Sequence, residues 1–169
     1  MSIIAAYMVP HPPMIVPDVG RGSEKQIQKT IDAYKQVASE IASLKPETVI
    51  ISSPHSIIYA DYFHISPGME ASGDFGNFRA RDVRFHEAYD EALVKEICSL
   101  AESEDFPAGT LGSKGSTFDH GTMVPLYFIR QKYKGGRIVR IGLSGLPLKE
   151  HYRLGQIIAE AVRLTGRNT

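Results

Sequence analysis

Three histidines lie in short motifs that could carry metal or acid–base chemistry. His11 lies in Val-Pro-His-Pro-Pro, His55 in Ser-Ser-Pro-His and His120 in Asp-His-Gly-Thr. Imidazole binds iron, zinc and copper, and a divalent ion needs ligands held in place to within roughly a few tenths of an ångström. Because prolines stiffen the loops around His11 and His55, these two residues are candidate metal ligands. The alternative is that they are two turn residues, since two histidines do not complete a metal site.

His120 is a candidate acid/base. Asp119 could orient its ring, and Gly121 could let a substrate approach the backbone closely. The following sequence predicts a helix whose positive end disfavours imidazolium, so a neutral His120 could accept a proton from a phenol or diol. The alternative is an ordinary polar residue before a helix. The residues next to the three histidines form the candidate substrate pocket: Pro12, Ser53, Asp119, Gly121 and Thr122.

The other histidines carry weaker signals. His64 lies in an alternating segment, and His86 and His151 lie near expected helix starts, which favours ordinary surface or interface roles. The glycines form neither a GxGxxG nor a Walker pattern, and no serine lies in a nucleophile-elbow context. The sequence therefore gives no signal for nucleotide binding or for a serine nucleophile.

The segments around His11 and His55 predict a strand, a helix and a second strand. Residues 3–9 form an uninterrupted apolar run, typical of a strand buried on both faces, and prolines end it around His11. Apolar residues at helical intervals predict a helix over 24–44, and β-branched residues predict a strand over 48–52, just before His55. This order implies a parallel pair with a right-handed crossover, so both histidines should emerge at one edge of the sheet.

The rest of the chain continues this α/β pattern. It predicts a strand over residues 59–66, a long loop over 71–81 and a helix over 85–103. Thr122 is expected to cap the next helix, with Pro125 tolerated in its first turn. The last expected elements are a strand over 137–143 and a helix that ends near Gly166.

Composition indicates one domain that handles a small molecule. A chain of 169 residues usually builds a single core, and 19 Lys plus Arg balance 19 Asp plus Glu. Without a basic surplus, neither nucleic acid nor an anionic membrane is expected as a partner. The single cysteine, Cys98, excludes an internal disulfide, and no segment approaches the roughly 20 apolar residues of a membrane span. We therefore expect a cytoplasmic protein.

Three segments together resemble the class III extradiol ring-cleaving dioxygenase (LigB-like) superfamily: MVPHPPMIVPDVGRG, SSPHSIIYADYFHISPG and STFDHGTMVPLYFI. More closely, the chain is similar to the N-terminal domain of the AmmeMemoRadiSam system protein A and Memo-like proteins. The resemblance implies the α/β fold of the class III extradiol dioxygenases (phosphorylase/hydrolase-like), with a mostly parallel central sheet flanked by helices. It also implies that His11 and His55 bind Fe(II) and that His120 is the acid/base.

The resemblance covers the whole chain but only about the first two thirds of the family domain. In true dioxygenases a glutamate supplies the third metal ligand, and no position here matches it. We therefore expect residues 1–169 to form a single, C-terminally truncated domain with an incomplete site. Such a chain should be nearly inactive alone, and its uncovered surfaces should make it a homo-oligomer or leave a neighbouring chain to complete the pocket.

The resemblance makes a non-haem Fe(II) extradiol dioxygenase the leading function, an oxidoreductase that opens a catecholic diol with O₂. One alternative is a non-catalytic, Memo-like metal-binding or scaffold module. A second alternative is a zinc-dependent hydrolase, in which a metal-bound water is the nucleophile. If the chain is active alone, an acidic residue such as Asp61 or Glu87 must supply the third ligand.

Overall fold

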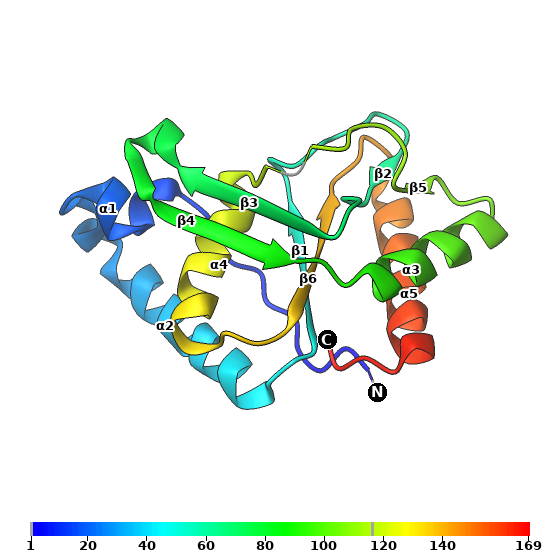
Figure 1. Cartoon of the computed structure of the whole chain (residues 1–169), viewed down its shortest axis with the longest axis horizontal. Helices are drawn as coiled ribbons and strands as arrows, with labels where there is room; N and C mark the ends of the chain where they lie inside the picture. Colours follow the sequence, from blue (N-terminus) through cyan, green and yellow to red (C-terminus); the bar gives the residue numbers. More distant parts are fainter. Residues whose placement is uncertain (1, 116) are drawn as a thin grey trace.

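A parallel pair of strands lies at the centre of the computed structural model, which describes residues 2–115 and 117–169 (Figure 1). β1 (Thr48–Ser53) pairs in parallel with β6 (Arg137–Gly142) along its whole length. Helices α2 (Gln28–Leu44) and α4 (His120–Lys132) pack on one face of this pair, and α3 (Glu91–Ser103) and α5 (Leu148–Thr165) pack on the other. The chain therefore has the α/β architecture with parallel strands flanked by helices that the sequence predicts.

The two layers follow from the composition of the central strands. Ile51 and Ile138 pack in one apolar core with α2 and α4, whereas Val139 and Ile141 pack in a second core with α3 and α5. Successive side chains of a strand point to opposite faces, so a strand that is apolar at every position contributes to two cores at once. Each central strand buries side chains on both of its faces. For this reason adjacent apolar residues mark these strands in the sequence.

Several predicted elements agree with the structure to within a few residues. β1, β6 and α5 lie where the sequence places them, and Gly166 ends α5 in the left-handed conformation with φ 66°. The predicted helix over 24–44 is divided into a short 3₁₀ helix, η2 (Ser23–Ile27), followed by α2. The predicted strand over 59–66 is reduced to β2 (Phe63–His64), which pairs in parallel with β5 (Ala108–Gly109).

Residues 3–9 do not form the predicted strand. Most of their side chains are exposed, and Met8 is completely so. Within the described chain, their backbone-to-backbone hydrogen bonds are confined to Ile4, which pairs with Thr169. The parallel partner of β1 is β6 rather than this segment. The apolar run therefore lacks the neighbouring strand that would satisfy its backbone and bury its two faces.

An antiparallel hairpin replaces the predicted loop over 71–81 and the start of the predicted helix over 85–103. β3 (Glu70–Phe75) and β4 (Ala80–Ala88) pair in antiparallel fashion around a short turn, η3 (Gly76–Phe78). Val83 and Phe85 alternate with exposed charged residues along β4 and pack against the core of α2 and α4. The prediction was wrong because Gly73 and Gly76 favour a loop, and the alternation that marks a strand covers only a few residues of β4.

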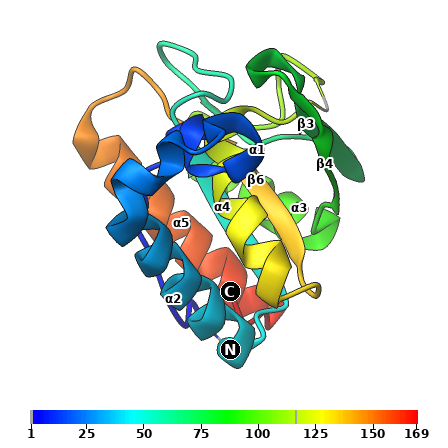
Figure 2. The same cartoon turned by 90° about the vertical axis from the view of Figure 1, so that its left-hand side faces the viewer.

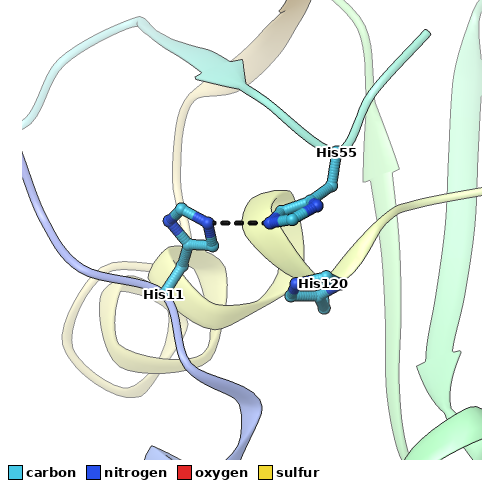
Figure 3. Close-up of side chains that lie close together, drawn as sticks. All are labelled: His11, His55 and His120. Atoms are coloured by element: carbon cyan, nitrogen blue, oxygen red, sulfur yellow. Dashed lines mark hydrogen bonds between the residues drawn. The ribbon is translucent and has the colours of Figure 1, made fainter.

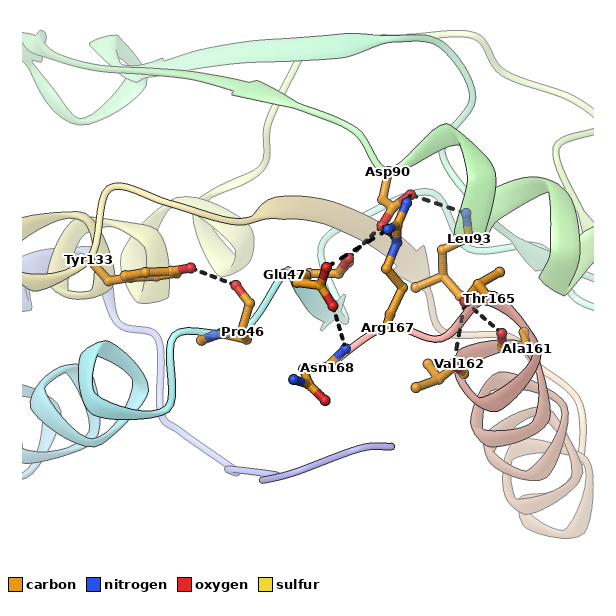
Figure 4. A network of polar contacts seen from close by, with 11 residues as sticks. Pro46, Glu47, Asp90, Leu93, Tyr133, Ala161, Val162, Thr165, Arg167 and Asn168 are labelled. Carbon is orange, nitrogen blue, oxygen red and sulfur yellow. Dashed lines mark hydrogen bonds and ion pairs between the residues drawn. The ribbon is translucent and has the colours of Figure 1, made fainter. Parts of the chain in front are cut away.

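Asp90 sets the start of α3 and ties three parts of the chain together (Figure 4). Its carboxylate accepts a hydrogen bond from the backbone nitrogen of Leu93 at 3.2 Å, which caps the helix. It also accepts from the Thr48 hydroxyl at 2.5 Å and from Arg167 Nε at 3.0 Å. The start of β1, the start of α3 and the segment after α5 therefore meet on one buried carboxylate.

Two short helices follow the first histidine motif, η1 (Pro13–Ile15) and α1 (Pro17–Gly20). Viewed from the side, they lie at the end of α2 and close to the hairpin of β3 and β4 (Figure 2). In the part of the chain that the structure describes, no helix is long and apolar enough to cross a membrane.

Candidate metal centre

His11, His55 and His120 come together at one end of the central strands (Figure 3). His55 lies two residues beyond β1, His120 is the first residue of α4, and His11 lies just before η1. The Tyr34 hydroxyl donates a hydrogen bond of 2.5 Å to the carbonyl oxygen of Pro10, which holds the His11 loop against α2. The structure thus places side by side the three histidines that the sequence motifs single out.

The three imidazoles are close enough to share one ion. One ring nitrogen from each lies within 4.8 Å of the others, and the Nε2 atoms of His11 and His55 are 3.0 Å apart. The ring centroids of His55 and His120 are separated by 4.0 Å. Two nitrogens that each lie about 2.1 Å from an ion are about 3.0 Å apart when the angle at the ion is about 90°. The donor set therefore fits a divalent transition metal.

Asp119 connects the loop of His55 with the helix of His120. Its Oδ1 accepts hydrogen bonds from the Ser53 hydroxyl at 2.6 Å and from the Thr122 backbone nitrogen at 3.0 Å. Its Oδ2 accepts from the Thr122 hydroxyl at 2.8 Å. Ser53 Oγ in turn accepts from the backbone nitrogen of His55 at 3.1 Å. Asp119, and not the predicted Thr122, is therefore the N-cap of α4, and it anchors the backbones that carry two of the histidines.

Gly121 is required by close packing at this point. A Cβ on Gly121 would collide with Ser53 Oγ and would lie only 3.0 Å from Asp119 Oδ1 and 3.2 Å from His55 Cδ2. Only a residue without a side chain lets these groups approach the first turn of α4 so closely. The missing Cβ of Gly121 thus makes room for protein side chains, and close approach of a substrate to its backbone stays a prediction.

The surroundings of His120 favour its neutral form. Partial burial lowers its pKa, the proximity of His55 and His11 lowers it further, and only Asp119 opposes this shift. His120 also occupies the first turn of α4, where the positive end of the helix dipole disfavours an added proton. A neutral imidazole has a free nitrogen lone pair, which can bind a metal or accept a proton.

The two acidic residues named from the sequence do not join this cluster. Within the described residues, the only group of three or more potential ligands consists of His11, His55 and His120. Glu87 forms a buried ion pair with Arg130, with 2.5 Å between Oε2 and Nη2, and Asp61 is an exposed residue outside the cluster. The proposal that either supplies a third ligand is therefore wrong for this arrangement of the chain.

Comparison with known proteins identifies the family. The model of the catalytic LigB subunit of aromatic ring-opening dioxygenase matches residues 5–168. The chain belongs to the LigB family. Because this match covers nearly the whole chain, the resemblance to the LigB-like superfamily and the class III extradiol dioxygenase fold are both confirmed.

Two relatives show how far the LigB-family match extends. Protein CA_C1420 of Clostridium acetobutylicum is 38% identical over 175 residues, which cover 99% of this chain and 37% of the relative. The 2-aminophenol 1,6-dioxygenase beta subunit of a Pseudomonas species is 23% identical over 185 residues, covering 98% of this chain and 59% of the relative. The chain therefore spans less than two thirds of the length of either relative.

An aromatic side chain that the sequence did not single out borders the cluster. Phe78, at the turn of the β3–β4 hairpin, lies edge-on to His120, with 5.5 Å between ring centroids and 71° between ring planes. Residues 71–81 were expected to form a long loop, and long loops often cover sites, but the choice of Phe78 depends on the hairpin. The hairpin thus places one aromatic side chain beside the histidine cluster.

The remaining predicted site and surface residues have structural partners. Pro12 is partly buried, and its carbonyl accepts a hydrogen bond from Ile15 in the turn of η1. His64 was expected at a surface or an interface, but it is completely buried, and its Nε2 lies 2.8 Å from the Ser113 carbonyl oxygen. Burial lowers the pKa of His64, which keeps it neutral. His86 is exposed and lies in β4 beside Glu70.

Proposed function

We propose that this chain carries the metal centre of a LigB-family ring-opening dioxygenase, with Fe(II) held by His11 and His55. The observation that carries the proposal is the convergence of three imidazoles from three separate segments within 4.8 Å. Membership of the LigB family supports iron and an aromatic substrate. The substrate class that we propose is a catecholic diol, and the relative named for 2-aminophenol supports a ring with two adjacent polar substituents.

His120 is proposed to act as the acid/base beside this ion. Bound Fe(II) would supply a Lewis-acidic centre at which a vicinal diol and O₂ can be brought together. The neutral ring of His120 can take the proton of a phenolic hydroxyl, because its pKa is held low by burial and by the neighbouring histidines. Phe78 offers an apolar surface for an aromatic ring and helps to keep water from His120.

A zinc-dependent hydrolase is the second candidate function, and the ligand set favours it. Three histidines without a carboxylate are the protein ligands of some catalytic zinc sites, in which a water molecule fills the fourth position. In that case His120 would be a ligand and not an acid/base. The two proposals therefore differ in the role of His120 and in the metal that the site prefers.

Metal content provides the first test of the site. The purified chain is loaded anaerobically with Fe(II) or Zn(II), desalted, and its metal-to-protein ratio is measured by mass spectrometry. We expect His11→Ala and His55→Ala to lose the bound ion, because the remaining ligands cannot hold it. His86→Ala, a change at an exposed histidine of β4, is the matched control. Equal metal content in His11→Ala and the unchanged chain would contradict the proposed centre.

Substrate turnover separates the remaining alternatives. Because the chain spans 37% and 59% of its two relatives, the complete reaction is proposed for the longer protein. Ring opening of a catechol by an iron-loaded protein supports the dioxygenase. Ester or amide hydrolysis by a zinc-loaded protein would favour the hydrolase instead. Metal binding at these histidines without either reaction would favour the non-catalytic, Memo-like module.

A further inference from the structure

An arginine is buried in one of the two central strands. Arg140 lies on β6 and is only 2% exposed, while the residues before and after it, Val139 and Ile141, pack in the apolar core with α3 and α5. Among the described residues, Arg140 forms no ion pair with a carboxylate. A charged group that is buried without an opposite charge must be compensated by hydrogen bonds. The partners in these hydrogen bonds therefore indicate what Arg140 does.

The guanidinium of Arg140 binds the part of the chain that leads to His120. Its Nη1 donates to the Thr117 carbonyl oxygen at 2.7 Å, and its Nη2 donates to the Gly115 carbonyl oxygen at 3.2 Å. Its Nε donates to Ser66 Oγ at 2.7 Å, which fixes the plane of the guanidinium. Arginine suits such a role because its planar group carries its donors in fixed directions. The central strands therefore hold the chain shortly before His120.

Strand β3 contacts the same part of the chain. The Phe118 backbone nitrogen donates to Ser72 O at 2.9 Å, and Ser72 pairs with Thr117 in an isolated parallel bridge. A Cβ on Gly73, the next residue of β3, would lie only 2.8 Å from Phe118 Cβ. The ring of Phe118 is buried and packs on the guanidinium, with 5.5 Å between Arg140 Cζ and the ring centroid. The chain thus enters α4 from a position that Arg140 and β3 fix together.

A second, mostly buried arginine provides a contrast. Arg130 pairs with Glu87, with 2.5 Å between Nη2 and Oε2, and it also donates to the carbonyl oxygen of Gly135 at 2.6 Å. Its charge is therefore compensated by a carboxylate, and the backbone that it holds lies beyond the end of α4 that is remote from the histidines. An apolar residue in place of Arg140 would avoid the cost of burying a cation without a carboxylate. Stability alone therefore does not account for Arg140.

We propose that Arg140 is a positioning residue for His120. Its contacts fix Thr117 and Phe118, and these residues set where α4 begins and where the ring of His120 lies relative to His55. Arg140 acts through the backbone, so it is not a catalytic residue. The proposal rests on the proposed function only for the use of that ring at a metal centre, because the placement of the ring needs no metal. The competing explanation is that the packing of α4 in its apolar core places His120 without Arg140.

The contact between His120 and His55 measures this placement directly. Their ring centroids are 4.0 Å apart, so the metal-free chain should show a nuclear Overhauser effect between the ring protons of the two residues. We expect Arg140→Met, which removes the donors and keeps a long side chain, to lose this effect. The stack of Tyr34 on Phe128, with 4.4 Å between ring centroids, is the internal control, because it reports the packing of α2 on α4 and should persist. Loss confined to the histidines would thus separate positioning from unfolding.

Arg130→Met is the matched control. It also removes a buried guanidinium and leaves Glu87 without its partner, so it should destabilise the chain and yet keep the contact between His55 and His120. Urea unfolding establishes that each variant is folded under the conditions of the measurement. If Arg140→Met does not fold, Arg140→Lys takes its place. Lysine keeps the charge, but one ammonium group cannot replace a planar fork that binds three acceptors, so the same loss is expected.

Two results would overturn the proposal. Persistence of the contact between His55 and His120 in a folded Arg140 variant would show that the packing of α4 suffices. Loss of this contact in Arg130→Met as well would show that any destabilisation displaces the ring. The measurement is made without metal, so failure of the unchanged chain to bind Fe(II) would contradict the proposed function and not the role of Arg140.

Discussion

Both oxygens of the Asp119 carboxylate are engaged by Ser53 and Thr122, so this residue acts on the site through the backbone. The sequence motif suggested that Asp119 orients the ring of His120. The hydrogen bonds show a different role: Asp119 fixes the start of α4 and, through Ser53, the loop of His55. Burial and the histidine neighbours lower the pKa of His120, while the charge of Asp119 opposes this shift.

Substitution of His120 distinguishes an acid/base from a metal ligand. If His120 is the acid/base, His120→Gln should leave the affinity for Fe(II) nearly unchanged and lower ring cleavage by roughly 10²–10⁴-fold. The affinity is measured by metal titration of this chain, and ring cleavage by steady-state kinetics of a full-length LigB-family dioxygenase with the corresponding substitution. His86→Gln is the control, because that imidazole lies on β4 outside the cluster. Loss of the ion from His120→Gln would instead assign this residue to the metal.

Gly121→Ala tests the close packing beneath the cluster. The added methyl group would collide with Ser53 Oγ and press on Asp119 and His55, so we expect a loss of roughly 1–3 kcal/mol in the free energy of unfolding and weaker metal binding. The matched control is Gly155→Ala in α5, where a Cβ would meet nothing within 4 Å. That change should stabilise the chain by about 0.5–1 kcal/mol, because alanine favours a helix. Urea unfolding measures both, and equal effects would contradict the packing argument.

At the scale of the elements, the sequence predicted the strands and helices whose formation depends on the local pattern of apolar residues. β1 and β6 carry apolar residues on both faces because each contributes to two cores, and α5 shows its helical stripe and ends at Gly166. The hairpin of β3 and β4 was missed because Gly73 and Gly76 favour a loop, and the alternation of apolar and charged residues that marks β4 as a strand is short. Residues 3–9 have the composition of a buried strand, but a strand also needs a neighbour, which no local pattern supplies.

In the candidate site, too, local motifs could be predicted and contacts between distant segments could not. His11, His55 and His120 could be singled out because each stands in a distinctive motif. The expected reason for their convergence, a parallel pair of strands that end at His11 and His55, was wrong, because residues 3–9 form no strand and the hydrogen bond from Tyr34 to Pro10 holds the His11 loop instead. Phe78, and the use of Asp119 as a cap, could not be predicted, since both depend on contacts between segments far apart in sequence.

Asp90 should make the start of α3 and β1 sensitive to acid. Burial raises its pKa, but hydrogen bonds from Thr48, Leu93 and Arg167 outweigh this effect and lower the pKa below its usual value. A lowered folded-state pKa stabilises the protein above the unfolded value of about 3.9, and this contribution is lost as the pH falls towards the folded value. Asp90→Asn should therefore be less stable than the unchanged chain at pH 7, by roughly 1–3 kcal/mol.

The difference between the two proteins should also shrink with acid. Urea unfolding of Asp90→Asn and of the unchanged chain between pH 7 and pH 3 measures this convergence. Asp32→Asn, a change at an exposed carboxylate of α2, is the control and should follow the unchanged chain. A constant difference between Asp90→Asn and the unchanged chain across this range would show that Asp90 stabilises the fold without its charge.

At the scale of the whole molecule, a mostly apolar groove of about 570 Å³ between residues 3–9 and β1 reaches the candidate metal centre. Pocket-lining residues include His11 and Gly121 as well as the apolar side chains of the N-terminal segment, so the groove reaches the cluster. The loop of His11 is held against α2 through Tyr34, but the segment before it is largely exposed. One proposed ligand, His11, therefore follows a segment that packs only loosely on the rest of the described chain.

The 169-residue chain taken alone should be inactive, or nearly so, as a ring-opening dioxygenase. Neutral imidazoles leave the charge of a divalent ion uncompensated, and no carboxylate joins the cluster among the described residues to lower that charge and fix the open coordination positions. The groove beside β1 also leaves an apolar surface that favours association, so we expect oligomers. The test is anaerobic loading with Fe(II), followed by exposure to O₂ with protocatechuate and simpler catechols, while size-exclusion chromatography with light scattering gives the oligomeric state. Abundant ring-opened product from a monomeric preparation would contradict this prediction, because it would mean that the three histidines suffice to hold the ion in a productive geometry.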